Sequence, residues 1–193
     1  MEAILKPIAY MESDFPSKFG IPRQSGLVEA LRSTIVFTPE YRDPAALRGI
    51  EGYSRLWLIW QFSEFADKPW SPTVRPPRLG GIARMGVFAT RSPRRPNSLG
   101  LSCVTLLGIK KTKDRGTVLH VGGADLMDGT PIFDIKPYVP YCDCFPDALG
   151  GFTDTAGAYL LQVDFPPALL TQFPEEKRKT VLALLSHLSL IHI

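Results

Sequence analysis

An arginine-rich loop is the first feature of the sequence that could do chemistry. Arg91, Arg94 and Arg95 fall within five positions of the segment GVFATRSPRRPNSLGLS, residues 86–102. Arginine is suited to forked contacts with phosphate or carboxylate groups and to stacking on bases. Two prolines in the same segment restrict φ and reduce the entropy that is lost when the loop is fixed. We therefore expect a stiff, positively charged loop that binds an anion.

The charge of the chain is distributed unevenly. Residues 68–113 contain ten basic residues and no acidic one, whereas the remainder contains 12 basic and 19 acidic residues. The net charge of +3 therefore hides a middle section of one sign, which favours a surface for a polyanion. The alternative is a set of solvated loops whose charge is balanced by acidic residues that lie close in space.

A second group of polar residues lies on the segment DGTPIFDIKPYVP, which begins at Asp128. With a period of two, Asp134, Lys136 and Tyr138 project from one face of a strand, where an acid, a base and a phenol could line a polar site. The alternative is a solvent-facing strand with a charge pair. Asp125 lies just upstream; carboxylates beside a turn cap backbone N–H groups, bind ribose hydroxyls or attract a cation.

Several common site signatures are absent from the sequence. There is no G-x-G-x-x-G fingerprint, P-loop or G-x-S-x-G elbow, so neither the usual dinucleotide cradle nor a serine hydrolase is indicated. His120 falls in an expected strand, which favours a half-buried structural residue over a base. Cys142 and Cys144 flank Asp143, but the three histidines lack paired spacing, so no metal is expected. The odd count of three cysteines indicates a reducing compartment.

The elements that must position these residues are mostly short strands, because 16 glycines and 18 prolines divide the chain. Apolar and β-branched runs predict strands over residues 33–38, 54–62, 86–90, 100–109 and 117–121, and within 128–140. Asp128-Gly129 is the expected tight turn of a hairpin. The predicted fold class is therefore mainly β, a barrel or a sandwich. Only residues 174–188, PEEKRKTVLALLSHL, have the pattern of an amphipathic helix.

Length and composition bound the class of protein. A chain of 193 residues, 45% hydrophobic and 21% charged, is expected to form one domain with a small appendage. No apolar run is long enough to span a bilayer, and the N-terminus lacks the pattern of a secretory signal. The sequence therefore predicts a soluble, cytoplasmic protein without membrane attachment.

Four segments closely resemble the TsaA-like family, whose characterised members are tRNA methyltransferases of the TrmO type. In family order they are KFGIPRQSGLV (residues 18–28), PTVRPPRLGG (72–81), RMGVFATRSPRRPNSLGLS (84–102) and DLMDGTPIFDIKPYVPY (125–141). The resemblance implies a single-sheet, β-barrel-like fold and a homodimer with S-adenosylmethionine bound near the subunit interface. It also implies methylation of N6 of threonylcarbamoyladenosine at position 37, beside the anticodon of threonine tRNA. The alternative is a cofactor-binding RNA module or regulator without methyl transfer.

The resemblance also implies which residues contact the cofactor and the RNA. The cofactor positions are Pro22, Arg23, Gln24, Ser63, Glu64, Arg91, Leu101, Asp125, Leu126, Met127 and Asp128. The expected RNA contacts are Arg75, Arg78, Arg94 and Arg95. In the family the pair at Ser63 and Glu64 usually begins with His, so a role that needs a histidine there does not transfer to this chain.

The chemistry implied by the resemblance is orientation of an activated methyl donor in line with the acceptor nitrogen. Arg23 and Arg91 would bind the methionyl carboxylate, and Asp125 or Asp128 would favour the cationic sulfonium. The acceptor nitrogen is urea-like and weakly nucleophilic, so removal of its proton should help. The residues that could take the proton or shape its environment are Asp128, Asp134, Lys136 and Tyr138.

The expected domain organisation follows from the same resemblance. Residues 1–165 form the TsaA-like β-barrel domain that binds the cofactor, and residues 166–187 form a helix that leads into a truncated C-terminal domain. The last six residues, 188–193 (LSLIHI), match a translation of CTG TCT CTT ATA CAC ATC, a transposon end used to prepare sequencing libraries. We therefore expect the native sequence to end near His187.

Overall fold

Several strands of the fold have buried side chains at every second position. In β3 (Arg55–Gln61), the side chains of Leu56, Leu58 and Trp60 are buried and the residues between them are half-buried. In β2 (Arg32–Phe37), Ser33, Ile35 and Phe37 alternate in the same way. Because successive side chains of a strand point to opposite faces, each of these strands offers one face to a common interior.

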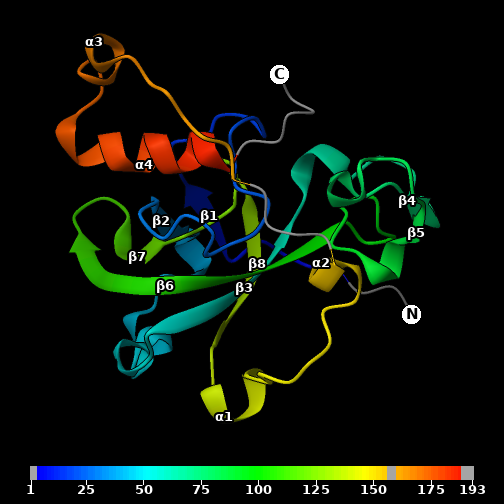
Figure 1. The fold of residues 1–193 in the computed structure, drawn as a ribbon. Helices are drawn as coiled ribbons and strands as arrows, with labels where there is room; N and C mark the ends of the chain where they lie inside the picture. The colour runs from blue at the N-terminus through cyan, green and yellow to red at the C-terminus, as the bar shows by residue number, and fades with distance from the viewer. Residues whose placement is uncertain (1–3, 156–159, 188–193) are drawn as a thin grey trace.

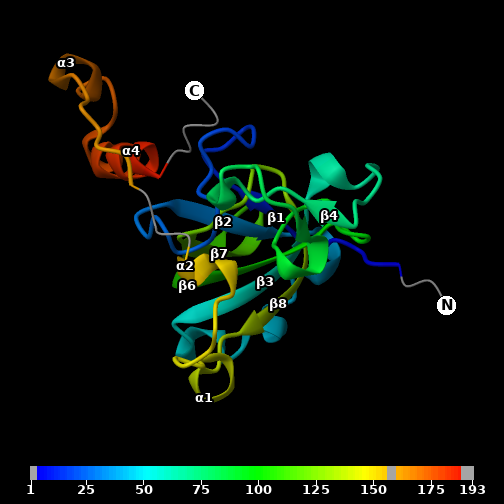
Figure 2. The same ribbon diagram turned by 45° about the vertical axis from the view of Figure 1, so that its right-hand side comes forward.

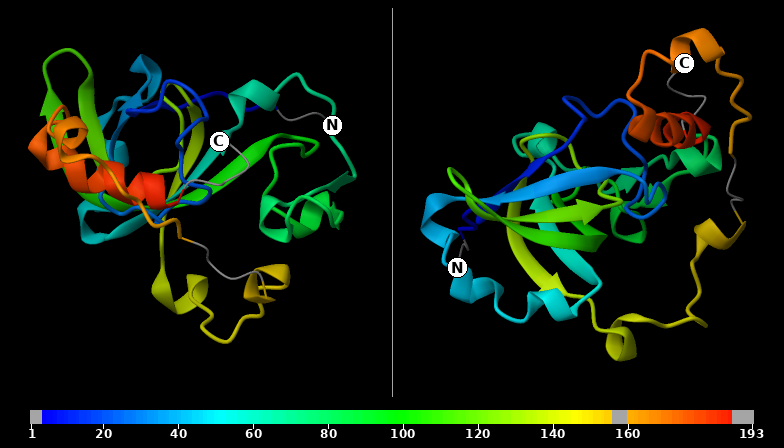
Figure 3. Two further views of the ribbon diagram at one scale, coloured as in Figure 1. Left: turned by 45° about the horizontal axis from the view of Figure 1, so that its top comes forward. Right: turned by 90° about the vertical axis from the view of Figure 1, so that its left-hand side faces the viewer.

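Six strands close into an antiparallel barrel in the computed structural model, which describes residues 4–155 and 160–187 (Figure 1). The order around the barrel is β1-β2-β7-β6-β3-β8. The other barrel strands are β1 (Ala9–Glu12), β6 (Leu99–Thr112), β7 (Gly116–Gly122) and β8 (Pro131–Pro137). Figure 3 shows these strands curving around one axis. Closure of the ring gives each strand a neighbour on both sides, although β6 is paired over only part of its length on each side.

The interior of the barrel is an apolar core. Met11, Ile35, Leu58, Val104 and Leu119 are all 0% exposed, and they come from five different strands. Full burial of a side chain of this size contributes about 1.5–3 kcal/mol. The barrel is therefore a rigid frame on which loops at its rim can be held.

The longest strand, β6, pairs with two neighbours over different parts of its length. Residues 99–105 pair with β3, and residues 105–112 pair with β7. The first half of β6 therefore has one side that no barrel strand covers. The loop that carries Ser25 packs along this open side, where Ser25 accepts a hydrogen bond from the Cys103 backbone N–H.

Residues 68–98, which we call the basic lobe, connect β3 to β6. The lobe holds the two-stranded sheet of β4 (Thr73–Val74) and β5 (Met85–Gly86), with the 3-10 turns η5 (Pro77–Leu79) and η6 (Val87–Ala89). It projects from the barrel at the start of β6, away from the hairpin between β6 and β7 (Figures 1 and 2). Charge and exposed side chains of the lobe are therefore displayed beside one end of the barrel.

The helix α4 (Glu175–Ser186) packs outside the barrel (Figure 2). Its Ala183 and Leu184 contact a small cluster formed by Phe15, Val28 and Leu31 in the segment between β1 and β2. The remaining short helices and turns are η1 (Pro39–Tyr41), η2 (Pro44–Leu47), η3 (Ile50–Gly52), η4 (Ser63–Phe65), α1 (Pro140–Asp143), α2 (Phe152–Thr155) and α3 (Pro167–Leu170). Within residues 4–155 and 160–187, no helix has the length and hydrophobicity needed to cross a membrane.

The structure confirms the mainly β prediction and selects the barrel over the sandwich. The helix expected over residues 174–188 is confirmed over Glu175–Ser186, directly after Pro174. The predicted strand over residues 86–90 is wrong, because only Met85–Gly86 pairs and the chain then turns through η6. The predicted hairpin at Asp128-Gly129 is also wrong: a turn is present, but β8 pairs with β1 and β3 and not with β7.

The two ends of the chain differ in how they compare with the sequence-based expectations. β1 went unpredicted, because four residues are too few to show an alternating pattern. The tail at residues 188–193, for which we expect an origin in the transposon end, lies outside the described residues.

Candidate functional site

A line of hydrogen bonds leads from the barrel core to the carboxyl group of Asp125. Trp60 Nε1 donates to Ser102 Oγ at 2.9 Å, and Ser102 Oγ donates to Asp125 Oδ1 at 2.6 Å. Ser102 is 0% exposed and Trp60 is 5% exposed. Asp125 follows β7 at the rim of the barrel, so its carboxyl group is positioned by residues that the core holds in place.

Burial of this carboxyl group raises the pKa of Asp125. Hydrogen bonds from Ser102, from the backbone of Asp125 itself and from the backbone of Ser25, and then the positive charge of Arg91, act in the opposite direction. An ionised carboxylate in such a place gains from any further positive charge, because water does not screen it fully. The site is therefore suited to a cationic group.

Pro22, Arg23 and Gln24, with the following Ser25 and Gly26, form what we call the PRQ segment. This segment lies along the open side of β6 and reaches Asp125 there. Ser25 Oγ accepts a hydrogen bond from the Cys103 backbone N–H at 3.0 Å, and Gly26 N–H donates to the Gly123 carbonyl at 2.9 Å. Gly123 has a φ of +71°, and a Cβ there would lie 3.3 Å from Gly26. The close approach of these two loops therefore depends on glycine.

Arg91, in the segment ATRS (residues 89–92), contacts the PRQ segment directly. Arg91 Nη1 donates to Gln24 Oε1 at 2.6 Å, and Gln24 Nε2 donates to the Arg23 carbonyl at 2.6 Å. Since Arg91 also acts on the charge of Asp125, three segments that are far apart in the chain meet here. Gln24, Arg91 and Asp125 form what we call the rim site.

A second positive group lies beside the rim site. Partial burial, and then the positive charge of Arg78, lower the pKa of Arg23. Two guanidinium groups that face each other without a carboxylate between them repel, and a bound anion relieves that repulsion. The rim site thus offers a carboxylate for a cation and guanidinium groups for an anion, which is the donor set that a zwitterionic ligand requires.

The other expected cofactor positions differ in how exposed their side chains are. Pro22 is buried, and Leu126 is 1% exposed and belongs to the barrel core. Met127 is half-buried. Asp128 is exposed, and its Oδ1 accepts a hydrogen bond from the Ser13 backbone N–H at 3.0 Å. Leu101 is 51% exposed on the outer face of β6.

Ser63 and Glu64 lie on η4, directly after β3. Both side chains are exposed, and Glu64 Oε2 pairs with Lys18 Nζ at 3.2 Å. This ion pair links η4 to the segment that continues into the PRQ residues. The Ser63 hydroxyl cannot take the part of the imidazole that the family usually has at this position, because it neither titrates near neutral pH nor carries a positive charge.

The expected catalytic group on β8 does not join the rim site. Asp134 is opposite Ile59 in the register of β3 and β8, and Lys136 is opposite Trp57, so both lie on the outer face of the barrel. Lys136 Nζ pairs with Asp134 Oδ2 at 2.9 Å, and the Tyr138 ring lies 5.9 Å from the Trp57 ring. Ser102 and Asp125 belong to the inner face. The geometry matches the alternative of a solvent-facing strand with a charge pair.

The four expected RNA contacts divide into two kinds. The side chains of Arg75, Arg78 and Arg94 are exposed and have no hydrogen-bond or ion-pair partner within the part of the chain that the structure describes. Arg95 is used inside its own loop, because its Nη1 donates to the carbonyl groups of Val87 at 3.2 Å and Thr90 at 2.6 Å. The structure therefore assigns Arg95 to holding the loop and leaves the other three free for a polyanion.

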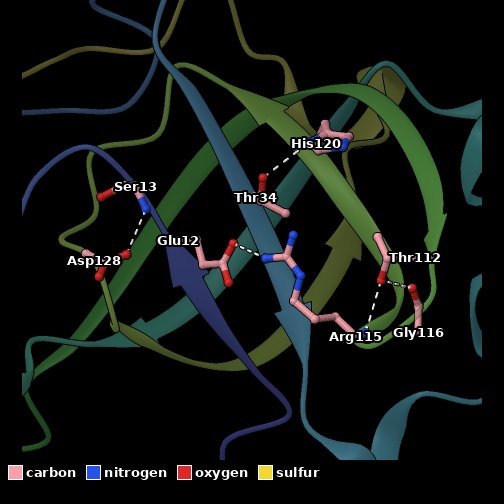
Figure 4. A network of polar contacts seen from close by, with 8 residues as sticks. All are labelled: Glu12, Ser13, Thr34, Thr112, Arg115, Gly116, His120 and Asp128. Carbon is pink, nitrogen blue, oxygen red and sulfur yellow. Dashed lines mark hydrogen bonds and ion pairs between the residues drawn. The ribbon is translucent and has the colours of Figure 1, made fainter.

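A separate hollow of ≈570 Å³ lies on the outer face of β1, β2 and β7. Figure 4 shows polar contacts around it: Arg115 pairs with Glu12, and Thr34 Oγ1 lies 3.2 Å from His120 Nδ1. His120 is half-buried, as expected of a structural residue. None of the lining residues belongs to the four segments on which the family resemblance rests, so we do not place the cofactor there.

Sequence reasoning missed three residues that build the rim site: Ser25, Trp60 and Ser102. Ser102 had a detectable signal, because it is a polar residue on the inward-facing positions of an apolar strand. Ser25 directly follows the PRQ triplet. Nothing in the sequence indicated that the Trp60 indole would bridge from the core to Ser102.

The chain is similar to known proteins in its sequence and in its overall fold. A family model described as the tRNA-methyltransferase O N-terminal domain matches residues 10–144. The tRNA (adenine(37)-N6)-methyltransferase of Escherichia coli K12 is 44% identical over 158 residues, which is 82% of this chain and 67% of that protein. RcsF of Pseudomonas aeruginosa PAO1, whose name assigns it to the S-adenosylmethionine-dependent methyltransferases, is 42% identical over 176 residues, 91% of this chain and 70% of that protein.

Solved structures show the same fold. The crystal structure of TrmO from P. aeruginosa superposes with a TM-score of 0.74 at 36% sequence identity. The superposition covers 97% of this chain and 79% of that chain. The likeness therefore extends over the barrel, the basic lobe and the C-terminal helix.

Proposed function

The chain belongs to the tRNA-methyltransferase O family, and from this membership we propose that it is an S-adenosylmethionine-dependent tRNA methyltransferase. Its proposed product is the N6-methylated form of threonylcarbamoyladenosine at position 37, beside the anticodon of threonine tRNA. The observation that carries the proposal is the rim site, where Gln24, Arg91 and Asp125 meet from three separate segments of the chain.

The rim site fits the charge pattern of S-adenosylmethionine. That molecule carries a carboxylate, an ammonium group and a sulfonium, and when bound it supplies an activated methyl group. Arg91 and Arg23 would hold the carboxylate by charge-assisted hydrogen bonds, and Asp125 would face the positive charge. Gln24 would align Arg91 through the hydrogen bond that it already accepts. Holding donor and acceptor in line supplies most of the rate gain in such a transfer.

We propose Asp128 as the group that takes the proton from the acceptor nitrogen. Its Oδ1 is occupied by the Ser13 N–H, whereas Oδ2 has no partner within residues 4–155 and 160–187 and is exposed to solvent. Asp128 is three residues from Asp125 on the same segment, so it lies close to the rim site. Asp134, the other candidate, is paired with Lys136 on the outer face of the barrel.

We also propose a homodimer that acts in the cytoplasm, with the cofactor near the subunit interface. Leu101 supports this arrangement, because it is 51% exposed and directly precedes Ser102, which binds Asp125. An apolar side chain exposed beside a polar site is suited to burial by a second copy. The basic lobe of each copy would then remain available for the anticodon stem and loop of the tRNA.

A transfer assay tests the proposed function. Threonine tRNA that carries the threonylcarbamoyl group but lacks the N6-methyl group is incubated with S-adenosylmethionine labelled in its methyl group. We expect label in this tRNA and none in a matched tRNA with unmodified adenosine 37. Calorimetry with the cofactor alone accompanies the assay. Cofactor binding without transfer would favour the alternative of a binding module. The absence of both cofactor binding and transfer would contradict the proposal.

Arg94→Ala is expected to weaken binding of the tRNA and to reduce the slope of log K against log salt concentration by about 1. The reason is that the exposed Arg94 side chain lies in a lobe without acidic residues and is free to contact a phosphate. Filter binding over a series of salt concentrations measures the slope. Arg48→Ala, which removes an exposed arginine outside the lobe, is the matched control. Equal slopes for the two variants would remove Arg94 from the RNA surface.

A further inference from the structure

The basic lobe displays two exposed aromatic rings that the rim site does not use, Trp70 and Phe88, and Phe88 is the more exposed of the two. Phe88 is 73% exposed, although phenylalanine is normally one of the more deeply buried residue types. It lies at the centre of η6 (Val87–Ala89), three residues before Arg91. Its Cα therefore lies within about 11 Å of that of Arg91, the extended length of three residues.

The backbone that carries Phe88 is held from both sides. Val87 is 1% exposed, and its N–H donates to the Pro72 carbonyl at 3.0 Å. The Thr90 N–H donates to the Val87 carbonyl at 3.1 Å, which closes the turn. Arg95 Nη1 donates to the carbonyl groups of Val87 and Thr90, so the same arginine fixes both ends of η6. The ring is thus presented to solvent on a backbone that has little freedom left to lose on binding.

Arg95 also lies over the ring that it helps to position. Its guanidinium carbon is 5.8 Å from the centre of the Phe88 ring, within the range of a cation–π contact. One face of the ring is therefore approached by a positive charge. The ring and the guanidinium form a composite apolar and cationic surface, which is the kind of surface on which nucleobases stack.

The positive charge around Phe88 indicates which kind of molecule binds over the ring. Residues 68–98 contain seven basic residues and no acidic one. None of the seven is in an ion pair within the residues that the structure describes. Two copies of this lobe placed against each other would repel, whereas a polyanion would neutralise them. Among polyanions, single-stranded RNA also offers flat rings for Phe88.

We propose that Phe88, supported by Arg95, is a stacking platform for a base of the anticodon loop adjacent to the target nucleotide. The proposal rests on the proposed function and adds to it the residue that receives the RNA bases beside the rim site. Exposed arginines such as Arg94 bind phosphates without regard to base position, and stacking on Phe88 sets which nucleotide faces Arg91.

Two substitutions of Phe88 test the platform by tRNA binding. Phe88→Leu keeps an apolar side chain but removes the aromatic ring, and we expect it to weaken tRNA binding by about 5- to 150-fold. Phe88→Trp keeps an aromatic ring and is expected to bind within about threefold of the unmodified protein. The salt slope is expected to stay unchanged in both, because no phosphate contact is lost. Binding of S-adenosylmethionine is also expected to stay unchanged.

Phe145→Leu is the matched control. Phe145 is 71% exposed, nearly the same as Phe88, but it lies after α1 and outside the basic lobe. We expect no change in tRNA binding for this variant. Equal tRNA affinity of Phe88→Leu and Phe145→Leu would overturn the platform, as would equal losses for Phe88→Leu and Phe88→Trp. A smaller molar mass of Phe88→Leu by light scattering would overturn it too, because it would show that a second copy covers the ring.

The outcome can be separated from that of the proposed function. If the unmodified protein transfers methyl groups and Phe88→Leu binds tRNA normally, the platform is wrong and the function stands. If the unmodified protein binds tRNA without transfer and Phe88→Leu loses affinity, the function is wrong and the platform stands.

Discussion

Asp125→Asn is expected to weaken S-adenosylmethionine binding by about 10- to 100-fold, the range for a lost charge-assisted interaction. The substitution keeps the shape of the side chain and one oxygen that can accept from Ser102 Oγ, but it removes the negative charge from the rim site. The cationic part of the cofactor then has no buried counter-charge. Isothermal titration calorimetry measures the affinity.

The same substitution is expected to raise the thermal stability of the cofactor-free protein at neutral pH. Burial raises the pKa of Asp125 in the folded state above its ordinary value of 3.8, so ionisation of the group disfavours the folded state. The stability contributed by the protonated form is complete below the unfolded pKa and is lost as the pH rises through the folded pKa. Asparagine does not ionise, so the variant should keep that stability.

A pH series separates this account from a general effect of the mutation. The melting temperatures of the two proteins should nearly coincide near pH 4 and diverge as the pH rises. Cofactor affinity of the unmodified protein should fall as Asp125 is protonated, whereas the low affinity of Asp125→Asn should not follow that titration. Asp147→Asn, at an exposed aspartate, is the control and should alter neither quantity. An Asp125→Asn protein that binds the cofactor normally would show that the rim site is not the cofactor site.

Gly100→Ala is expected to destabilise the fold by about 1–3 kcal/mol, the range for overpacking a core. Gly100 is opposite Trp60 in the register of β3 and β6, and the indole ring covers it. A Cβ at residue 100 would lie 2.5 Å from Trp60 Cζ2 and 2.7 Å from Trp60 Cδ2, so the ring or the strand must shift. For a chain of this size, about 2–4 °C of melting temperature is lost per kcal/mol.

The shift of the indole should also reach the rim site. Trp60 Nε1 donates to Ser102 Oγ, which in turn donates to Asp125, so a displaced ring removes the support of that carboxyl group. We therefore expect lower cofactor affinity in addition to lower stability. Gly108→Ala is the matched control on the same strand, because a Cβ at residue 108 meets no atom within 4 Å. Equal melting temperatures for the two variants, measured by differential scanning calorimetry, would contradict the packing of Trp60 on Gly100.

The sequence alone determined the features that depend on local geometry. A strand favours apolar, β-branched and aromatic residues, so the run SRLWLIWQF predicted the strand that the structure places at Arg55–Gln61. A helix has a period of 3.6 and favours proline and acids at its start, so α4 was predicted with its first residue correct to one position. The run of basic residues without acids predicted a surface for a polyanion, because acidic neighbours close in sequence are absent.

Only the tertiary structure decided which of these features meet. Gln24, Arg91 and Asp125 come together because the barrel closes in the order β1-β2-β7-β6-β3-β8, and this order depends on contacts between residues far apart in the chain. The same closure puts Asp134 and Lys136 outside and Ser102 inside, although all three lie on alternating strands. Arg95 turned out to hold its own loop because two carbonyl groups of η6 lie within its reach. A local pattern predicts which face of a strand a residue occupies. Which residue lies across from it depends on the pairing of distant strands, and no local pattern in the sequence predicts that pairing.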